Sequence, residues 1–466
     1  MGLRRMLVTA WQVTEPVDPQ TRRVLAQRWA ALPAASRTPA QLLGRHAVGC
    51  EGTHGVFPKC NLTCSPCYHS KDANKVRVDG SHTLGQVRAQ MWLLRRLRGP
   101  RAHAQLIGGE VSLLDPDDHA QALLAMRAEG REPMSMTHGD FDYEYLEKLV
   151  LGPGGAVRLP RVSFAAHFDS LMRGRRGVPR PRTEADLDQA RAGFVAMFDT
   201  LQTRHGVRSY LAHSMTVTPA NLDQVGGVVA NVASMGYQML SFQPAAFVGD
   251  DRRWGQGYQE VTIDAVWHQV EAGLGQPVSW RAFQFGDTRC NRTAFGAMVG
   301  RSWQPVVHHD RPVELAARDA FLAHFGGVNF GGSGRFALAG KVLRVLAAHP
   351  GDVVLAARWA RSAVTRAGGW RDVVKAVRAG RVRPMTFVVH NFMDAADVAP
   401  AWALLQAGTV ADDPRLRQTQ ERLSACTYAM AHPETGQLVP ACVQHCVLDP
   451  GENAQLRRLL PLTVLR

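Results

Sequence analysis

Three cysteines lie close together near the start of the chain, in the sequence KCNLTCSPCY at residues 59–68. Cys60, Cys64 and Cys67 have the spacing C-x3-C-x2-C. Thiolates this close on one loop can each bind one iron of a cubane iron–sulfur cluster. The fourth iron would then have no protein ligand and would be open to a small molecule.

Two other uses of these thiols stay open. A structural zinc site prefers four ligands, usually as two pairs of Cys or His, and Cys50, His54 and His69 lie near the triad. Disulfides are typical of short, cysteine-dense secreted chains, whereas this chain has 8 cysteines in 466 residues. The spacing therefore favours iron–sulfur ligation over zinc, and zinc over disulfides.

Residues 50 to about 250 alternate short apolar runs with amphipathic segments. We expect one strand before the cysteine loop and others at 104–109, 133–139, 161–169, 210–218 and 237–245. Helices are expected between them at 84–98, 117–128, 142–150, 184–205 and 221–235. This alternation predicts six βα units around a parallel sheet. In βα barrels the chemistry takes place at the carboxyl ends of the strands.

Polar motifs follow the expected strands at those ends. Gly108-Gly109-Glu110 closes the second strand and Thr137-His138-Gly139 the third. Glycines let another group approach the backbone closely, and a carboxylate or carbonyl there accepts hydrogen bonds from an ammonium group. Further polar side chains on the fourth and fifth strands are candidate ligand contacts, and each could equally be a helix cap or a satisfied core group: Ser163, His167, Asp169 and Thr218. Asn221 is expected to cap the helix after the fifth strand.

Composition limits the class of protein. The formal net charge is +14, from 54 Lys and Arg against 40 Asp and Glu. Such a balance attracts nucleic acid, anionic membranes or acidic substrates, although arginine-rich composition is also typical of GC-rich genomes. We find no run of about 18 apolar residues, and the N-terminus lacks the long apolar region of a signal peptide. We expect a cytoplasmic protein, with peripheral contact to a membrane surface as a further option.

Two segments of the sequence are rich in basic residues. Arg173, Arg175 and Arg176 lie in what we expect to be an exposed loop, either solvated or clamping an anionic group. Residues 335–383 contain eleven Lys or Arg against two Asp, with apolar residues at helical spacing. They predict cationic amphipathic helices, which either lie at a membrane interface or pack on the core with a solvated basic face. No RNA-binding signature accompanies the charge.

The remaining cysteines gather toward the C-terminus. Cys442 and Cys446 form a C-x3-C pair, and Cys426 and Cys290 precede them. These four predict a second, auxiliary metal site, with His445 as an alternative to Cys290 for the fourth ligand. The competing interpretation is that the cysteines are small buried hydrophobes.

The cysteine triad followed by Gly108-Gly109-Glu110 at a strand end resembles the radical SAM superfamily. The resemblance implies a partial (β/α)6 barrel, a 4Fe-4S cluster on Cys60, Cys64 and Cys67, and S-adenosylmethionine (SAM) chelated to the open iron. It implies that Gly108, Gly109 and Glu110 lie against the methionine amino group, and that Ser163, His167, Asp169 and Thr218 contact the ribose and carboxylate. Relatives have an aromatic residue directly before the third cysteine. Here Pro66 occupies that position, so Tyr68 becomes the candidate adenine contact.

A narrower resemblance covers the C-terminal block. The stretch Asn391-Phe392-Met393-Asp394-Ala395, followed by Cys426, a short hairpin and Pro440-Ala441-Cys442, is similar to tetraether lipid synthases and their relatives. These join unactivated carbons of lipid chains by radical chemistry. This resemblance implies a small-molecule or lipid substrate, auxiliary iron–sulfur sites, and an electron donor such as a ferredoxin or flavodoxin.

Together these observations predict an α/β radical SAM enzyme with a helical, cysteine-containing C-terminal extension. It would cleave SAM to a 5′-deoxyadenosyl radical that abstracts hydrogen from an unactivated C–H bond. The expected organisation is a helical leader (1–49), a core barrel (50–250), a helical basic extension (251–420) and a cysteine-containing segment (421–466). Two alternatives remain: a peptide-modifying radical SAM enzyme, and a basic protein with a structural metal site that binds nucleic acid or membrane.

Overall fold

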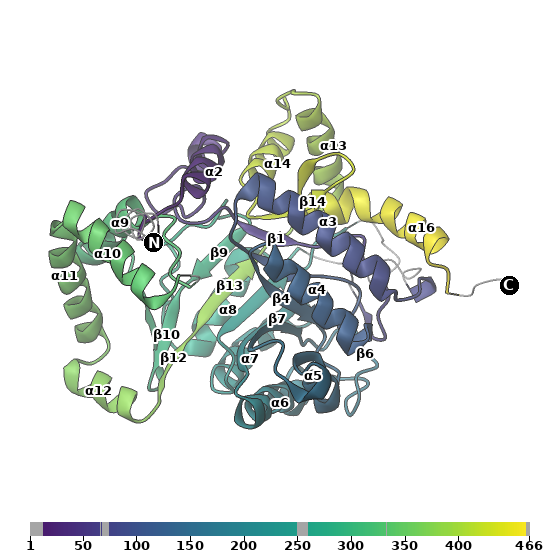
Figure 1. The fold of residues 1–466 in the computed structure, drawn as a ribbon, viewed down its shortest axis with the longest axis horizontal. Coiled ribbons are helices and arrows are strands. Elements are labelled where there is room, and N and C mark those ends of the chain that lie inside the picture. Colours follow the sequence, from purple (N-terminus) through teal and green to yellow (C-terminus); the bar gives the residue numbers. More distant parts are fainter. Residues whose placement is uncertain (1–12, 66, 68–73, 249–259, 332, 463–466) are drawn as a thin grey trace, which may run out of the picture.

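The chain folds around one large, mostly parallel β-sheet (Figure 1). The computed structural model describes residues 13–65, 67, 74–248, 260–331 and 333–462. The strand order is β15-β14-β1-β3-β4-β5-β7-β8-β13-β9. Its central six strands follow chain order and pair in parallel: β1 (Cys50–Gly52), β3 (Ala102–Leu106), β4 (Arg131–Thr137), β5 (Arg161–His167), β7 (Arg208–Val217) and β8 (Met239–Pro244).

Helices connect these strands and cover the sheet. They are α3 (Gly80–Arg98), α4 (Pro116–Ala128), α5 (Tyr143–Val150), α6 (Asp188–His205), α7 (Val225–Val232) and α8 (Ile263–Leu274). Local sequence sets where they begin. Asp79 and Asp115 accept backbone N–H groups of the first turns of α3 and α4, and Pro116 follows at the first helical position. Buried aromatic side chains, among them Phe164 and Phe198, fill the space between sheet and helices.

The predicted α/β class and the six consecutive βα units are confirmed, and the strand order is consistent with a partial (β/α)6 barrel. Expected and observed strands differ at their ends by at most three residues, close to the usual uncertainty of element boundaries. The cysteine loop leaves the carboxyl end of β1. The motif after β3 and the polar residues after β4, β5 and β7 therefore share its edge of the sheet.

The C-terminal third adds strands as well as the expected helices. β13 (Thr386–His390) pairs in parallel with β8, and β9 (Asn291–Ala294) pairs antiparallel with β13. A separate small sheet contains β10 (Gly296–Val299), β11 (Ser302–Pro305) and β12 (Val382–Pro384). Beside it lie α9 (Pro312–His324), α10 (Arg335–Ala348), α11 (Gly351–Arg366) and α12 (Trp370–Arg378) (Figure 1).

The last part of the chain completes the other end of the large sheet. β14 (Tyr428–His432) is parallel to β1 and pairs with β15 (Gln437–Pro440). The surrounding helices are α13 (Ala395–Gln406), α14 (Pro414–Ser424), α15 (Ala441–Val443) and α16 (Asp449–Leu459), while α2 (Pro19–Ala30) comes from the N-terminal leader. The predicted boundaries at residues 49, 250 and 420 stay predictions. Within the described residues, no helix combines the length and apolar character needed to cross a bilayer.

Candidate active site

The cysteine loop is held at its centre by the segment that follows β5. Cys64 lies in β2 (Thr63–Cys64), which pairs antiparallel with β6 (Met172–Arg173). The backbone N–H of Cys60 donates to Asn74 Oδ1 at 3.1 Å, and the N–H of Leu62 donates to Cys60 Sγ at 3.4 Å. Cys60, Cys64 and Cys67 are all half-buried. Three thiol groups thus lie on one short loop, and hydrogen bonds or strand pairing hold the backbone at the first two.

The surroundings of Cys60 disfavour a bare thiolate. Burial raises the pKa of its thiol to about 12, and the nearby Glu110 and Cys67 add to the effect, while the Leu62 N–H opposes it. A coordinated metal removes the proton from a thiol ligand and supplies the missing positive charge. The donor set of this loop therefore fits a bound iron–sulfur cluster.

The Gly108-Gly109-Glu110 turn packs directly on the start of the cysteine loop. Gly109 N–H donates to the carbonyl of Phe57 at 2.7 Å, and Glu110 N–H donates to the carbonyl of Lys59 at 2.9 Å. A Cβ atom on Gly109 would lie 2.1 Å from the Lys59 oxygen and 2.2 Å from the Pro58 oxygen. The second glycine is required because two backbones touch here.

The Glu110 carboxylate is buried and connects two strand ends. It accepts the backbone N–H of Ser112 at 2.9 Å, the Thr137 hydroxyl at 2.6 Å and the backbone N–H of His138 at 2.7 Å. Three donors already satisfy this side chain, so in this structure it orders the ends of β3 and β4. The contact of Glu110 with the methionine amino group stays a prediction.

His138 links β4 to the cysteine loop. Its Nδ1 accepts the backbone N–H of Asp140 at 3.0 Å, so Nε2 carries the proton and donates to Asn61 Oδ1 at 2.7 Å. Burial lowers the pKa of His138, although the negative charge of Glu110 opposes this effect. The lowered pKa favours the neutral ring. The sequence placed His138 at a strand end, but its partner Asn61 was not predicted.

The expectation of an exposed basic loop is wrong for Arg175. Its guanidinium is buried, donates to the backbone carbonyls of His138 at 2.7 Å and His167 at 3.1 Å, and lies over the Phe168 ring at 4.5 Å. Arg173 and Arg176 remain exposed, and Arg176 pairs with Asp140. Arg175 is buried because two strand ends present it with carbonyl oxygens, which the sequence of the loop could not reveal.

His167 and Asp169 do meet at this edge. His167 Nε2 lies 2.5 Å from Asp169 Oδ2 and 3.0 Å from Thr216 Oγ1, which joins the ends of β5 and β7. Asp169 is buried, and its other oxygen accepts the N–H of Leu171. The His167 side chain is 33% exposed. It is therefore a polar side chain at this edge that a ligand could reach.

Two other candidates lie differently. Ser163 is near the start of β5, four residues before His167 and so roughly 13 Å from the strand end. The structure does not bring it to the edge. Thr218 is buried in a local turn, where its N–H donates to Asn221 Oδ1 at 2.8 Å. Tyr68, Pro66 and His69 lie outside the described residues.

The expected cap at Asn221 is wrong in its detail. Asn221 occupies the residue before a short 3-10 turn, but its side chain makes no capping hydrogen bond there. Instead its amide donates to Glu184 Oε1 and to the Thr216 carbonyl, both at 3.0 Å. Glu184 in turn pairs with the fully buried Arg191 at 2.7 Å. Asn221 therefore belongs to a buried polar network with Glu184 and Arg191, next to the end of β7.

The C-terminal cysteines Cys290, Cys426 and Cys446 lie near Cys442. Burial raises the pKa of Cys442, and the neighbouring thiols of Cys426, Cys290 and Cys446 raise it further. Arg422 Nε donates to Cys290 Sγ at 3.0 Å, which links α14 to the start of β9. Cys446 faces the Met393 carbonyl at 3.6 Å. The auxiliary metal site on these cysteines, or on His445, stays a prediction.

A different group has the closest spacing of potential ligands. Among the described residues, His54, His432 and Glu452 are the one set of three whose ligand atoms lie within 4.8 Å of one another. The rings of His54 and His432 stack with their centroids 4.0 Å apart, and His54 Nδ1 lies 3.0 Å from Glu452 Oε2. Burial lowers the pKa of His54, but the hydrogen bond and the charge of Glu452 raise it by more, so the pKa of His54 lies above its ordinary value. We interpret the set as an ion pair that ties α16 to the loop after β1.

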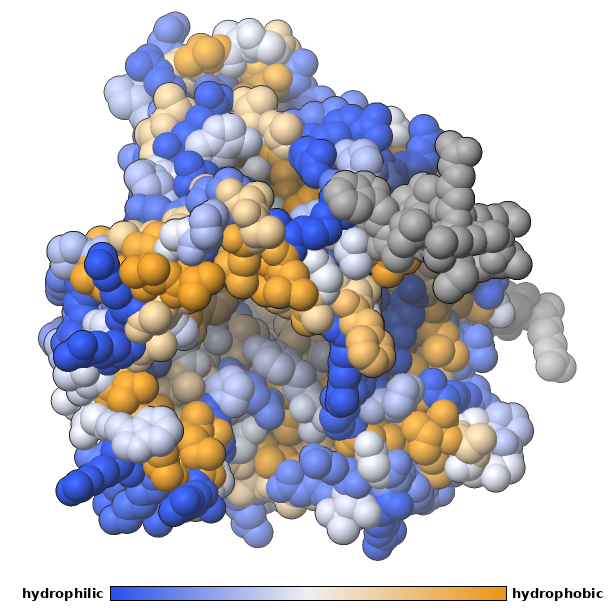
Figure 2. All heavy atoms as spheres, turned by 60° about the vertical axis from the view of Figure 1, so that its left-hand side comes forward, coloured by the Kyte–Doolittle hydropathy of each residue, from blue (hydrophilic) through white to orange (hydrophobic). Residues whose placement is uncertain are grey.

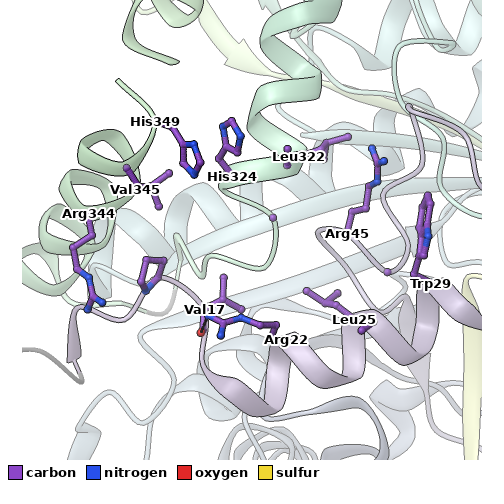
Figure 3. Close-up of a pocket in the computed structure, with 16 residues that line it drawn as sticks. Val17, Arg22, Leu25, Trp29, Arg45, Leu322, His324, Arg344, Val345 and His349 are labelled. Carbon is purple, nitrogen blue, oxygen red and sulfur yellow. Dashed lines mark hydrogen bonds between the residues drawn. The ribbon is translucent and has the colours of Figure 1, made fainter. Parts of the chain in front are cut away.

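A large cavity lies elsewhere on the molecule. It has a volume of about 770 Å³, and its walls come from α2, the turn at Gly44, α9 and α10 (Figure 3). Arg22, Arg45 and Arg344 line it together with the stacked rings of His324 and His349. Because its lining residues belong to these elements, the cavity is separate from the cysteine loop.

Comparisons with known proteins give limited similarity. No family model and no curated protein match the chain. Among solved structures it is similar to SuiB of Streptococcus suis, at 12% identity and a TM-score of 0.28 over 47% of this chain and 42% of SuiB. It is also similar to anSMEcpe with bound AdoMet, at 12% identity and a TM-score of 0.31 over 47% of this chain and 57% of that protein. The matches span less than two thirds of either protein.

Proposed function

We propose that this chain is a radical SAM enzyme. The observation that carries the proposal is the direct contact between the Gly108-Gly109-Glu110 turn and the cysteine loop, through the carbonyls of Phe57 and Lys59. These two motifs are far apart in sequence, and the fold brings them together at the carboxyl edge of six parallel strands. A structural zinc loop would not require that contact.

Cys60, Cys64 and Cys67 are the residues that would hold the 4Fe-4S cluster. When bound, the cluster supplies the electron that cleaves SAM into methionine and a 5′-deoxyadenosyl radical. The protein's part is to fix the loop. β2 pairs with β6, His138 holds Asn61, and the glycine turn holds residues 57–59. These contacts support the proposal, because they fix the backbone of the loop around Cys60 and Cys64.

The polar groups at the edge divide into orienting and accessible ones. Glu110 and Asp169 are buried and position their neighbours, Thr137 and His167. The half-buried Gly108 and Gly109, where they do not pack on residues 57–59, and the partly exposed ring of His167 remain for contact with SAM. We assign SAM binding to these positions, with Thr218 and Tyr68 as further candidates from the sequence.

For the substrate we propose an unactivated C–H bond of a lipid chain. The support is the resemblance of residues 391–395 to tetraether lipid synthases, together with their place at the carboxyl end of β13. Asp394 Oδ1 accepts the N–H of Phe247, just after β8, at 2.7 Å, and the Phe247 carbonyl accepts the N–H of Ala395. The segment therefore adjoins the same edge of the sheet as the cysteine loop. An auxiliary cluster on the C-terminal cysteines and a ferredoxin or flavodoxin as electron donor complete the proposal.

The test is SAM cleavage by anaerobically reconstituted protein with dithionite, measured as 5′-deoxyadenosine. Wild type should form it, and the Cys60→Ala/Cys64→Ala/Cys67→Ala variant should not. Cys50→Ala is the matched control, because Cys50 lies at the opposite end of β1. Absence of 5′-deoxyadenosine in cluster-loaded wild type would overturn the proposal. Deuterium transfer from a perdeuterated lipid, rather than from a deuterated peptide, would separate the lipid substrate from the peptide alternative.

A further inference from the structure

Helices α10, α11 and α12 carry large hydrophobic side chains that are exposed in the part of the chain that the structure describes. Phe336 on α10 is 95% exposed and Trp370 on α12 is 71% exposed. Leu343, Val353, Val354 and Val377 on the same three helices are also exposed. These helices lie together on one side of the molecule, and the view that turns this side forward shows hydrophobic patches directly beside strongly hydrophilic ones (Figures 1 and 2).

The exposed side chains lie on one side of their helices. Phe336 and Leu343 are seven residues apart on α10, and Trp370 and Val377 are seven apart on α12. Residues with this spacing share a helix face. On α12 the basic residues Arg371, Lys375 and Arg378 line the adjoining face. Helices α10 and α12 therefore each present an apolar stripe, which cations border on α12, while α11 adds the adjacent Val353 and Val354.

The charge of the segment is strongly one-sided. Residues 335–383 contain eleven Lys or Arg and two Asp. One of the two, Asp352, is largely buried and pairs with His324 at 2.7 Å. Two of the cations are also paired, Arg366 with Glu314 and Arg344 with Glu15, so nine Lys or Arg remain against Asp372. A surface of this kind repels cationic partners and attracts anionic ones. Lys and Arg close to an anionic bilayer each add to its binding.

The exposure is a property of the folded helices. The inner side of α11 is fixed to α9, because Ser362 and Arg366 both donate to Glu314 Oε1 at 2.7 Å. Trp359 on the same helix donates to the Val306 carbonyl at 2.8 Å. With its inner side fixed, α11 holds Val353 and Val354 outward.

We propose that the α10–α12 surface, residues 335–383, docks on an anionic lipid bilayer. The apolar stripes enter the boundary between headgroups and acyl chains, and the exposed arginines and lysines pair with lipid phosphates. Nucleic acid would account for the charge alone, since its binding does not need exposed valine, leucine and phenylalanine. The combination of both features favours the bilayer. The proposal does not depend on the cysteine loop or its chemistry.

The experiment is vesicle co-sedimentation of the full chain. One set of vesicles contains phosphatidylcholine only, and the other contains about a third phosphatidylglycerol. Wild type should bind the anionic vesicles at least about tenfold more tightly, and about 0.5 M salt should weaken the binding. Trp370→Ser/Val377→Ser and Arg371→Gln/Lys375→Gln/Arg378→Gln should each lose about tenfold in affinity.

Matched controls come from exposed residues elsewhere. Trp92→Ser removes a half-exposed tryptophan from α3, and Arg180→Gln/Arg182→Gln removes exposed charge from another loop. Both should bind like wild type. Quenching of tryptophan fluorescence by brominated anionic lipid should fall in Trp370→Phe, which reports the depth of that ring directly.

Several results would overturn the proposal. One is equal binding to both kinds of vesicle, and another is wild-type binding by Trp370→Ser/Val377→Ser. A third is a dimer that this variant dissociates, without vesicle binding by wild type, which would make the surface a contact between two copies. Tight DNA binding, without a preference for anionic vesicles, would show that the basic surface binds nucleic acid instead of lipid.

Discussion

His138 and Asn61 join the third parallel strand to the cysteine loop, with His138 Nε2 lying 2.7 Å from Asn61 Oδ1. The backbone of His138 is itself fixed by Glu110, so the end of β3, the end of β4 and the loop form one hydrogen-bonded unit. This unit fixes the start of the cysteine loop, on both sides of Cys60, before any metal is bound.

His138→Ala should loosen the cysteine loop. It removes the donor to Asn61 and the acceptor of the Asp140 N–H, each worth about 1 kcal/mol when buried. Iron retained per chain after anaerobic desalting should fall at least about twofold. His138→Gln keeps an amide donor and should retain more iron than the alanine variant. Equal retention by wild type and both variants would contradict this role.

Gly109→Ala should destabilise the protein by about 1–3 kcal/mol, because its Cβ would meet the carbonyls of Pro58 and Lys59. The matched control is Gly85→Ala at an exposed position of α3, where nothing lies within 4 Å of the new methyl group. That change should stabilise by about 0.5–1 kcal/mol through helix propensity. Chemical denaturation measures both, and a neutral Gly109→Ala would show that the turn and the loop are not in tight contact.

His119 should make stability fall in mild acid. It is fully buried between the Tyr145 hydroxyl at 2.9 Å and the Ser135 hydroxyl at 2.8 Å, and burial lowers its pKa to about 3. Between about pH 6.5 and pH 3 the unfolded chain binds a proton at this residue and the folded chain does not. The free energy of unfolding should therefore drop by about 1.4 kcal/mol per pH unit below 6.5.

His119→Gln removes that titration while keeping a side chain that can donate and accept. The difference in unfolding free energy between pH 7 and pH 5 should shrink by about 2 kcal/mol in this variant. An unchanged difference would mean that His119 is protonated in the folded protein.

The buried pair Glu51–Arg131 should be far more important for stability than the exposed pair Glu132–Arg161. Both side chains of the first pair are fully buried, with Arg131 Nε 2.9 Å from Glu51 Oε2. Arg131→Met would leave a buried carboxylate without its partner and should cost about 3–5 kcal/mol. Arg161→Met, in a pair that is nearly half-exposed, should cost less than about 1 kcal/mol. Similar losses in both variants would contradict the assignment of Glu51 as a buried charge.

The sequence was sufficient for the six central βα units, because each strand and helix has its own local periodicity. It was not sufficient for β13 and β14. β13 is a five-residue strand that pairs with β8, 147 positions earlier in the chain, and β14 pairs with β1 near the opposite end of the sequence. No local pattern identifies a strand's partner at such separations.

The site shows the same limit. The cysteine triad and the Gly-Gly-Glu turn were recognisable from residue types and spacing alone. Arg175 was assigned to an exposed loop because its neighbours are polar, and only the fold supplies the carbonyls of His138 and His167 that accept its hydrogen bonds. Ser163 was chosen for its strand, and the position along that strand decided against it.

The most direct test of the radical SAM proposal is the iron and acid-labile sulfide content after anaerobic reconstitution. It should be measured for wild type and for the Cys60→Ala/Cys64→Ala/Cys67→Ala variant. We expect at least about four iron and four sulfide per wild-type chain, and a loss of about four of each in the variant. Zinc in place of iron in the wild type, or an unchanged iron content in the variant, would contradict the proposal.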